Sequence, residues 1–347
     1  RQSSAASDVY KRQVSYKSNF TDTTLATIGD EITLTFKTNE SIQQPLVTIS
    51  GNSAIVNGSD TVWNANYVMQ ESDSDGPIPF EISAVTDVKG NPSAASIVAT
   101  TNSSLVIFDK TKPNLDLVRI YSNNSDTTWA KTGDSVFIRF KSDELLTQSS
   151  AFISSENAEV IYLGSQKYLA KYVMQSTDQE GDISFEITFT DSVGISGDPV
   201  TETSNSSNVI FDKTLPLLEY VHIQSNNSNN SSIAVIGDNV YLTFYPFSLD
   251  PILLDSTSVT ISGQNATVTQ NGDTFSANIP ITELIPGGFL TYTIDFVDRA
   301  GNRGNQVSVS TDDSYVNHDI VPPSIDSVLI FSNNTFTEWA KVGDSVF

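Results

Sequence analysis

Apolar and polar residues alternate in three segments of the chain, and this alternation predicts half-buried β-strands. The apolar sets are Ile32, Leu34 and Phe36, then Val136, Ile138 and Phe140, then Val240, Leu242 and Phe244. A period of two residues places each set on one face of a strand. A second alternating segment at residues 183–189 has counterparts at residues 78–82 and 290–296.

The same segments show that the chain is a tandem repeat. The stretch KTGDSVFIRFKSDE around Gly133 recurs as TIGDEITLTFKTNE around Gly29, as VIGDNVYLTFYPFS around Gly237, and in part as KVGDSVF around Gly343. These four glycines are spaced by 104, 104 and 106 residues, so one repeat has the size of a domain and not of a solenoid unit.

Short β-branched segments separated by Gly, Asn, Asp and Ser predict about seven strands in each repeat. The predicted fold class is therefore all-β, with tandem Ig-like antiparallel β-sandwich domains. We name the predicted domains repeat 1 (residues 14–112), repeat 2 (113–215), repeat 3 (216–322) and the truncated start of repeat 4 (323–347).

Proline-containing linkers at residues 110–113, 213–216 and 320–323 separate the predicted domains. Proline limits φ and extends the residue before it, so these short linkers predict a semi-rigid rod. Residues 1–13 match no part of the repeats and resemble translated adapter sequence; the alternative is a native disordered start. Phe347 corresponds to Phe137 in the middle of a core strand, which predicts a fragment of a longer array.

Composition excludes several classes of function. The chain has 18 Lys plus Arg against 41 Asp plus Glu, a net charge of −23, so it is expected to bind neither nucleic acid nor an anionic membrane surface. It has no cysteine, so each domain must be stabilised by burial alone. No apolar run is long enough for a membrane-spanning helix.

Several motifs carry a resemblance to a known family. Phe-Asp-Lys-Thr-x-Pro occurs at residues 108–113 and 211–216, and the turn Asp-Arg-Ala-Gly-Asn at residues 298–302. With them the chain resembles the tandem bacterial-Ig or fibronectin III-like repeats of extracellular surface proteins and adhesins. The resemblance implies a spacer, filament or adhesive stalk outside the cell. The turn Asp191-Ser-Val-Gly194 departs from the pattern.

The sequence offers little for catalysis. His222 and His318 are the two histidines, and neither belongs to a nucleophile motif or a metal-binding His-x-x-x-His pair. They are expected to be surface residues, and the chain is not expected to be an enzyme.

Acidic residues recur near the ends of the repeats and form a candidate calcium site. They are Asp109, Asp212 and Asp319 before the linkers, and Asp87, Asp191 and Asp298 in the turns. If they converge at the junctions, their oxygens could bind Ca²⁺, the one cofactor that the sequence suggests. The alternative is that each acid bonds its own turn backbone.

Asn-x-Ser/Thr acceptors for N-glycans are frequent. They are Asn19, Asn39, Asn57, Asn102, Asn123, Asn205, Asn226, Asn229, Asn230, Asn265 and Asn333. Three of them share one loop position in successive repeats, which favours glycosylation of a secreted protein; the alternative is that Asn and Ser simply form turns.

The pattern as a whole predicts a non-catalytic structural protein of an extracellular or cell-surface filament. Its partners would be copies of itself or other filament subunits. One alternative is the stalk of an adhesin that presents a ligand-binding tip. A further alternative is a spacer in a modular secreted hydrolase.

Overall fold

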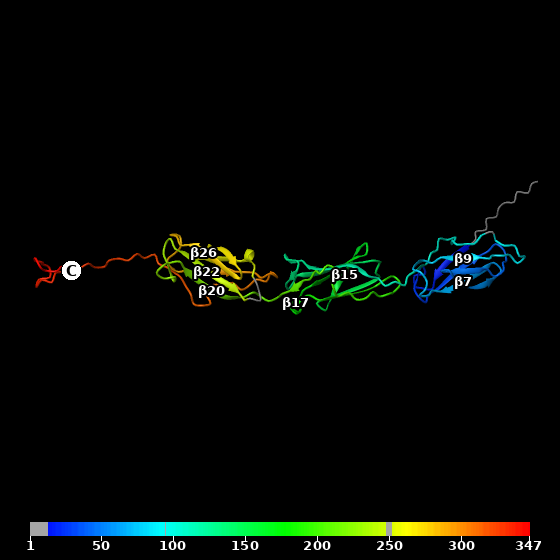
Figure 1. The fold of residues 1–347 in the computed structure, drawn as a ribbon, viewed down its shortest axis with the longest axis horizontal. Helices are drawn as coiled ribbons and strands as arrows, with labels where there is room; N and C mark the ends of the chain where they lie inside the picture. The colour runs from blue at the N-terminus through cyan, green and yellow to red at the C-terminus, as the bar shows by residue number, and fades with distance from the viewer. Residues whose placement is uncertain (1–12, 94, 248–251) are drawn as a thin grey trace, which may run out of the picture. The chain divides into compact units, whose positions relative to one another are not determined.

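The computed structural model describes residues 13–93, 95–247 and 252–347. The chain divides into two units, Arg1–Phe211 and Asp212–Phe347, and each is described by itself. In Figure 1 the strands gather in successive groups along the chain, with the described residues almost entirely strand, turn and loop. A single 3-10 turn, Leu254–Ser256, interrupts this pattern in the described part. The predicted segment at residues 1–13 lies outside the described residues except for Gln13.

Repeat 1 has two facing sheets. The first contains, in order, β1 (Gln13–Ser18), β3 (Glu31–Lys37), β7 (Val62–Val68) and β6 (Ile55–Ser59). The second contains β5 (Asn52–Ser53), β4 (Leu46–Ile49) and β9 (Phe80–Ser83). The short strands β2 (Leu25–Ala26), β10 (Ile107–Phe108) and β8 (Gly76–Pro77) form a third, small sheet.

Repeat 2 has the same arrangement with one longer strand. Its main sheet contains β11 (Leu115–Ser122), β13 (Ser135–Ser142), β16 (Lys167–Val173), β15 (Glu156–Gly164), β14 (Gln148–Ile153) and β18 (Phe185–Thr190). β15 is nine residues long and pairs with β16 and, through its first residues, with β14. It therefore joins the two layers that are separate sheets in repeat 1. β12 (Trp129–Ala130), β19 (Ile210–Phe211) and β17 (Gly181–Asp182) form the small sheet.

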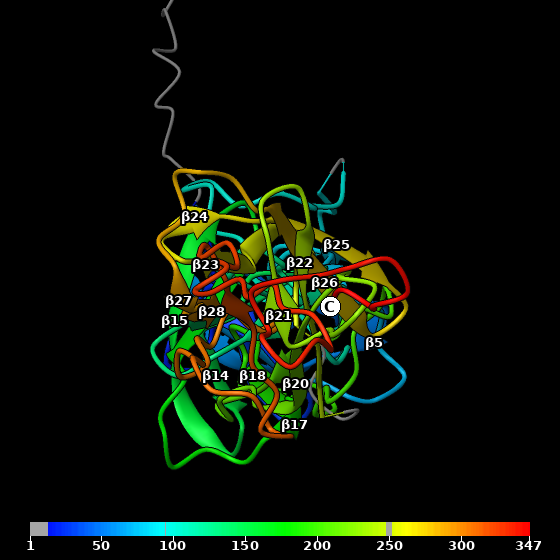
Figure 2. The ribbon, with the colours of Figure 1, turned by 90° about the vertical axis from the view of Figure 1, so that its left-hand side faces the viewer.

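The second unit contains repeat 3. One layer has β20 (Leu218–Ser225), β22 (Asn239–Pro246), β26 (Thr274–Pro280) and β25 (Thr267–Asn271). The other has β24 (Gln264–Asn265), β23 (Ser258–Ile261) and β28 (Tyr292–Asp295), and Figure 2 shows β23 and β28 beside the layer of β22 and β26. β21 (Ile233–Ala234), β29 (Asn317–His318) and β27 (Gly288–Phe289) form the small sheet.

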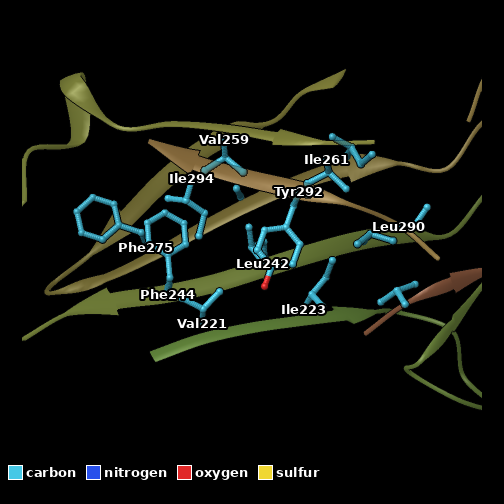
Figure 3. Packing of buried hydrophobic residues seen from close by; sticks show 14 of the residues in the cluster. Val221, Ile223, Leu242, Phe244, Val259, Ile261, Phe275, Leu290, Tyr292 and Ile294 are labelled. Atoms are coloured by element: carbon cyan, nitrogen blue, oxygen red, sulfur yellow. The ribbon is translucent and has the colours of Figure 1, made fainter. Parts of the chain in front are cut away.

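Each repeat buries its own apolar core, and the three clusters share no residue. The alternation predicted for β3, β13 and β22 is confirmed, because every apolar residue of those three sets is at most 2% exposed. Figure 3 shows the core of repeat 3, where Val259 and Ile294 from one layer face Phe244 and Leu242 from the other. Burial of such side chains, at about 25 cal/mol per Å², is the main stabilising term in a chain without disulfides.

The small sheet differs in one respect from a wholly antiparallel sandwich. β2 pairs with β10 in parallel, and β12 with β19 and β21 with β29 do the same. The parallel pairs bring the end of each repeat back to its beginning, next to the linker. The all-β, Ig-like fold class is otherwise as predicted.

Residues 324–347 reproduce one turn of the repeats without a core. The side chain of Ser332 bonds the carbonyl of Trp339, as Ser122 bonds Trp129 and Ser225 bonds Ile233. The apolar residues of this segment are exposed, among them Ile325, Leu329 and Trp339 at 73% or more. In the described chain they have no second layer to cover them.

His318 corrects the expectation that both histidines lie on the surface. It occupies the position of Phe108 and Phe211 in the small sheet and is 1% exposed. Its Nδ1 lies 3.2 Å from the carbonyl oxygen of Pro286, while Nε2 is buried without a hydrogen-bond partner. A buried nitrogen without a partner costs about 1–3 kcal/mol of stability.

Replacing His318→Phe should therefore stabilise repeat 3, because phenylalanine fills the same position in the other repeats and has no polar atom to satisfy. We expect the free energy of unfolding to rise by about 1–3 kcal/mol, measured by urea and thermal unfolding. The reciprocal change Phe211→His should destabilise repeat 2 by a similar amount. A loss of stability in His318→Phe would contradict this account.

Candidate metal centre at the first linker

Asp109 stands directly after β10, where repeat 1 ends. The buried Phe108 anchors the strand, and the amide of Asp109 donates to the carbonyl of Ala26 at 2.9 Å. One carboxylate oxygen of Asp109 accepts the amide of Thr111 at 3.0 Å. The side chain is thus held at the start of the linker.

The linker itself bonds to both repeats of the first unit. Asp75 of repeat 1 accepts the amide of Lys110 at 2.9 Å and the hydroxyl of Thr111 at 2.6 Å. On the other side, the amide of Asn114 donates to the carboxylate of Asp143 at 2.9 Å. Such bonds fix the linker backbone at residues 109–114.

Two acids of repeat 2 lie beside Asp109. Glu144 is in the loop after β13, and its carbonyl accepts the hydroxyl of the buried Ser142. Asp191 follows β18 and is fully buried. Its Oδ1 accepts the amides of Val193 and Ile195, both at 2.9 Å, in a turn that Gly194 completes with a φ of +88°.

Oxygens of Asp109, Glu144 and Asp191 all lie within 4.8 Å of one another. Within the described ranges of the chain this is the single group of three acids so placed. The second carboxylate oxygen of Asp191, Oδ2, is buried and has no hydrogen-bond partner. A buried carboxylate oxygen left without a donor is costly, and a cation would satisfy it.

A single substitution between repeats explains why Oδ2 is unpaired. In repeat 1 the side-chain amide of Asn91 donates to Oδ2 of Asp87 at 2.7 Å, and in repeat 3 Asn302 donates to Asp298 at 2.9 Å. Repeat 2 has Ile195 at this position, which has no donor in its side chain. The departure from the turn motif therefore leaves the carboxylate open toward the other two acids.

The electrostatics of the three acids agree with a site for a cation. Burial, and then the negative charges of Asp109, Asp191 and Asp143, raise the pKa of Glu144 to about 7. Burial and the charge of Asp191 likewise raise the pKa of Asp109. Glu144 and Asp109 therefore resist ionisation beside their acidic neighbours unless a positive charge joins the group.

The donor set fits Ca²⁺. This ion takes six to eight oxygens at about 2.3–2.6 Å, so oxygens on opposite sides of one ion lie about 5 Å apart. The three acids come within that span and supply hard carboxylate ligands, with no nitrogen or sulfur ligand among them. The sequence predicted Asp109 and Asp191 for this site and missed Glu144.

The other predicted metal ligands are not brought into such a group. Asp87 bonds its own turn through both oxygens, and these hydrogen bonds, the first from the side chain of Asn91, lower its pKa. Asp298 is buried and is paired through both oxygens with Asn302. Asn302 also donates to the carbonyl of Asp212 at 3.1 Å, which links turn and linker. Asp319 is exposed and accepts the amide of Val321.

The predicted glycan acceptors are all exposed. In the recurring Ser-Asn-Asn loop, the side-chain oxygen of Asn123 accepts the amide of Ser135 at 2.8 Å, and Asn226 and Asn333 accept the equivalent amides. This loop geometry gives these asparagines a structural role of their own. Glycosylation stays a prediction.

His222 forms a contact with an acid near the surface of repeat 3. Its Nδ1 lies 2.7 Å from the carboxylate of Asp312, and its Nε2 lies 3.5 Å from the side-chain oxygen of Gln224. The described residues include no helix that is long and apolar enough to cross a membrane.

Comparison with known proteins supports the fold. The sequence matches no protein-family model and no curated protein. A solved structure from a 1.5-MDa bacterial ice-binding adhesin, concerned with retention at the host cell surface, is 15% identical; the match covers 90% of this chain and 98% of that one, with a TM-score of 0.53.

Two further matches superpose more loosely. A Ca²⁺-stabilized adhesin with which an Antarctic bacterium binds ice is 12% identical, with coverage of 92% and 76% and a TM-score of 0.41. Invasin, a bacterial integrin-binding protein, is also 12% identical, with coverage of 94% and 63% and a TM-score of 0.31. The first match, with the ice-binding adhesin, agrees with the tandem Ig-like fold that the sequence motifs predicted.

The raised pKa of Glu144 predicts how pH acts on repeat 2 when divalent cations are removed. Between its ordinary pKa of 4.5 and about 7, folded Glu144 keeps a proton that the unfolded chain releases. Stability should therefore fall as pH rises through this window. Glu144→Gln should abolish that fall, so that the variant melts at a higher temperature than the wild type at pH 8 and not at pH 4.

Thermal melts in EDTA from pH 4 to 8 measure this difference. Glu40→Gln is the matched control, because Glu40 has the same place after β3 in repeat 1 and does not belong to the acid group. Parallel curves for the wild type and Glu144→Gln would contradict the prediction.

Proposed function

We propose that the chain is a non-catalytic, load-bearing segment of an extracellular or cell-surface filament, in which tandem Ig-like sandwiches set the length, and short linkers, the first with a bound cation, set the stiffness. The observation that carries this proposal is the linker at residues 109–114. Its backbone bonds to Asp75 of repeat 1 and to Asp143 of repeat 2, and its first residue belongs to the acid group. A linker held from both sides transmits force instead of absorbing it.

Calcium would complete the first linker. Asp109 comes from the linker, whereas Glu144 and Asp191 come from loops of repeat 2, so one ion bound by all three would tie the end of repeat 1 to repeat 2. It would also satisfy Oδ2 of Asp191 and neutralise part of the repulsion among the three acids. Neutralisation matters in a chain with a net charge of −23.

The stalk of an adhesin is a second candidate. It is favoured by the match to the ice-binding adhesin, which extends over 90% of this chain and hence over successive repeats. In that case the repeats would hold a separate ligand-binding domain away from the cell. Both candidates give the repeats the same mechanical task and differ in what the array assembles with.

Electron microscopy of native extracellular material, labelled with an antibody against residues 114–212, separates the two. A filament subunit should give label that repeats along an ordered fibre. A stalk should give isolated label on thin projections from cells. Label confined to the cell interior would contradict both.

Calcium should stabilise repeat 2 specifically. At a concentration about 100 times its Kd, a ligand that binds only the folded state adds about 2.7 kcal/mol to the free energy of unfolding. We expect this gain to be lost in Asp191→Asn and in Ile195→Asn, since the second variant supplies the amide that caps the turn acid in repeats 1 and 3.

The measurement compares thermal unfolding in Ca²⁺ and in EDTA, together with calorimetric titration of the chain. Asp87→Asn is the control, because that carboxylate is already paired within its own turn. Identical melting of the wild type in Ca²⁺ and in EDTA would rule out the cation-bound linker and leave the filament and stalk assignments to the microscopy.

A further inference from the structure

The outward face of the main sheet of repeat 2 concentrates positive charge. It carries Arg119 on β11, Arg139 and Lys141 on β13, and Lys167 and Lys171 on β16. These residues alternate with the buried Ile138, Phe140, Tyr168 and Ala170, so they share the opposite face. Five of the 18 Lys and Arg residues of an acidic chain thus lie on one side of one sheet.

The cross-strand register places like charges directly opposite each other. Arg119 pairs with Arg139 across β11 and β13, and Lys141 pairs with Lys167 across β13 and β16. Like charges at such positions destabilise a sheet. The repulsion in these two pairs lowers the stability of repeat 2, which is stabilised by burial alone. The chain has many acidic residues, yet none stands at these four positions.

Few acids compensate these cations. Asp116 bonds Lys141 at 3.2 Å, and Glu159 stands opposite Lys171 across β15 and β16. Neither Arg139 nor Lys167 has an ion pair with any residue that the structure describes. Their positive charge is therefore available to an anionic ligand.

The face is also concave and partly aromatic. The outward residues Leu117, Arg119, Arg139, Lys141 and Lys167 are among those that line a shallow depression. Beside it, the rings of Tyr121 and Phe137 stack at 5.3 Å, and the guanidinium of Arg119 lies 5.2 Å from the centre of the Tyr121 ring. Four cations around a depression suit an oxyanion, and the half-buried rings of Tyr121 and Phe137 next to it suit the flat face of a sugar.

The other two repeats lack this surface. At the five cation positions, repeat 1 has Ser15, Thr35, Lys37, Val62 and Asn66, and repeat 3 has His222, Thr243, Tyr245, Thr274 and Asn278. A lateral contact between copies that recurs along the array would need the same surface on every repeat. The restriction to repeat 2 favours a separate ligand over a second copy of the chain.

We propose that the outward face of β11, β13, β16 and β15 in repeat 2 binds a sulfated polysaccharide, with a sulfate group in the depression and sugar rings against Tyr121 and Phe137. A sulfate ester has three terminal oxygens and can accept from several cations at once, whereas a carboxylate has two. The negative charge elsewhere on the chain is screened beyond about 8–10 Å at physiological salt, so the local cations decide the contact.

Binding of the whole chain to dextran sulfate, measured by calorimetry at physiological salt, tests the proposal. The variant Arg139→Thr/Lys167→Thr removes two cations that have no ion pair and uses the residues that repeat 3 has at both positions, Thr243 and Thr274. We expect its affinity to be about tenfold lower, as the loss of two exposed ion pairs allows. The control Lys17→Thr/Lys37→Thr removes the same charge from the corresponding sheet of repeat 1 and should bind like the wild type.

Several results would overturn the proposal. If the Arg139→Thr/Lys167→Thr variant still binds dextran sulfate like the wild type, or if the control variant loses as much affinity, the binding site does not lie on this face. Equal binding of unsulfated dextran would exclude the sulfate, and equally tight binding of single-stranded DNA would assign the face to nucleic acid. A further outcome is that the wild type self-associates at low salt and does not bind dextran sulfate. If the Arg139→Thr/Lys167→Thr substitutions abolish this self-association and the control substitutions do not, the occupant of the face would be a second copy of the chain. Circular dichroism checks that every variant folds.

Discussion

Burial of one face of each main strand is the interaction on which the rest of this structure depends. Without cysteine, a sandwich of about 100 residues has to be held by layers such as Val136, Ile138 and Phe140 packed against the opposite sheet. Because the inward residues carry the stability, the outward residues are free to differ. They include several Thr and Asn in repeat 1, five Lys and Arg in repeat 2, and several Tyr and Thr in repeat 3.

At the turns, too, one part of a residue is needed for the fold and another part is free to vary. The Asp-x-x-Gly turn folds through backbone amides that bond Oδ1 of the aspartate, and this bond is present in all three repeats. The second oxygen is not needed for the turn, so its partner can change without loss of the fold. An asparagine in repeats 1 and 3 closes it, and Ile195 in repeat 2 leaves it open for the proposed cation.

The sequence was sufficient to predict the fold, because period-two alternation and repeats of 104 and 106 residues can both be recognised without knowing any contact between strands. It was less informative about the sites. Asp109 and Asp191 stood out by their place in recurring motifs. Glu144 was not singled out as a ligand, although it too recurs: Glu40 stands at the same place in repeat 1. Alternation likewise shows that Arg139 and Lys141 point outward, but only the register between strands shows that they face Arg119 and Lys167.

His318 marks the limit of reasoning by residue type. A histidine near a linker was expected at the surface, whereas the structure buries it; its match to Phe108 and Phe211 in the other repeats was the signal that could have indicated this. Position in a repeat therefore outweighs residue chemistry when the two disagree. The same reasoning distinguishes repeat 2 from its neighbours. Where it departs from them, at Ile195 and along the outward face of β13 and β16, it has a carboxylate oxygen without a donor and cations without an ion pair, which its core does not require. Tandem copies of one fold make such departures interpretable, because each neighbouring repeat shows what the fold alone would have used.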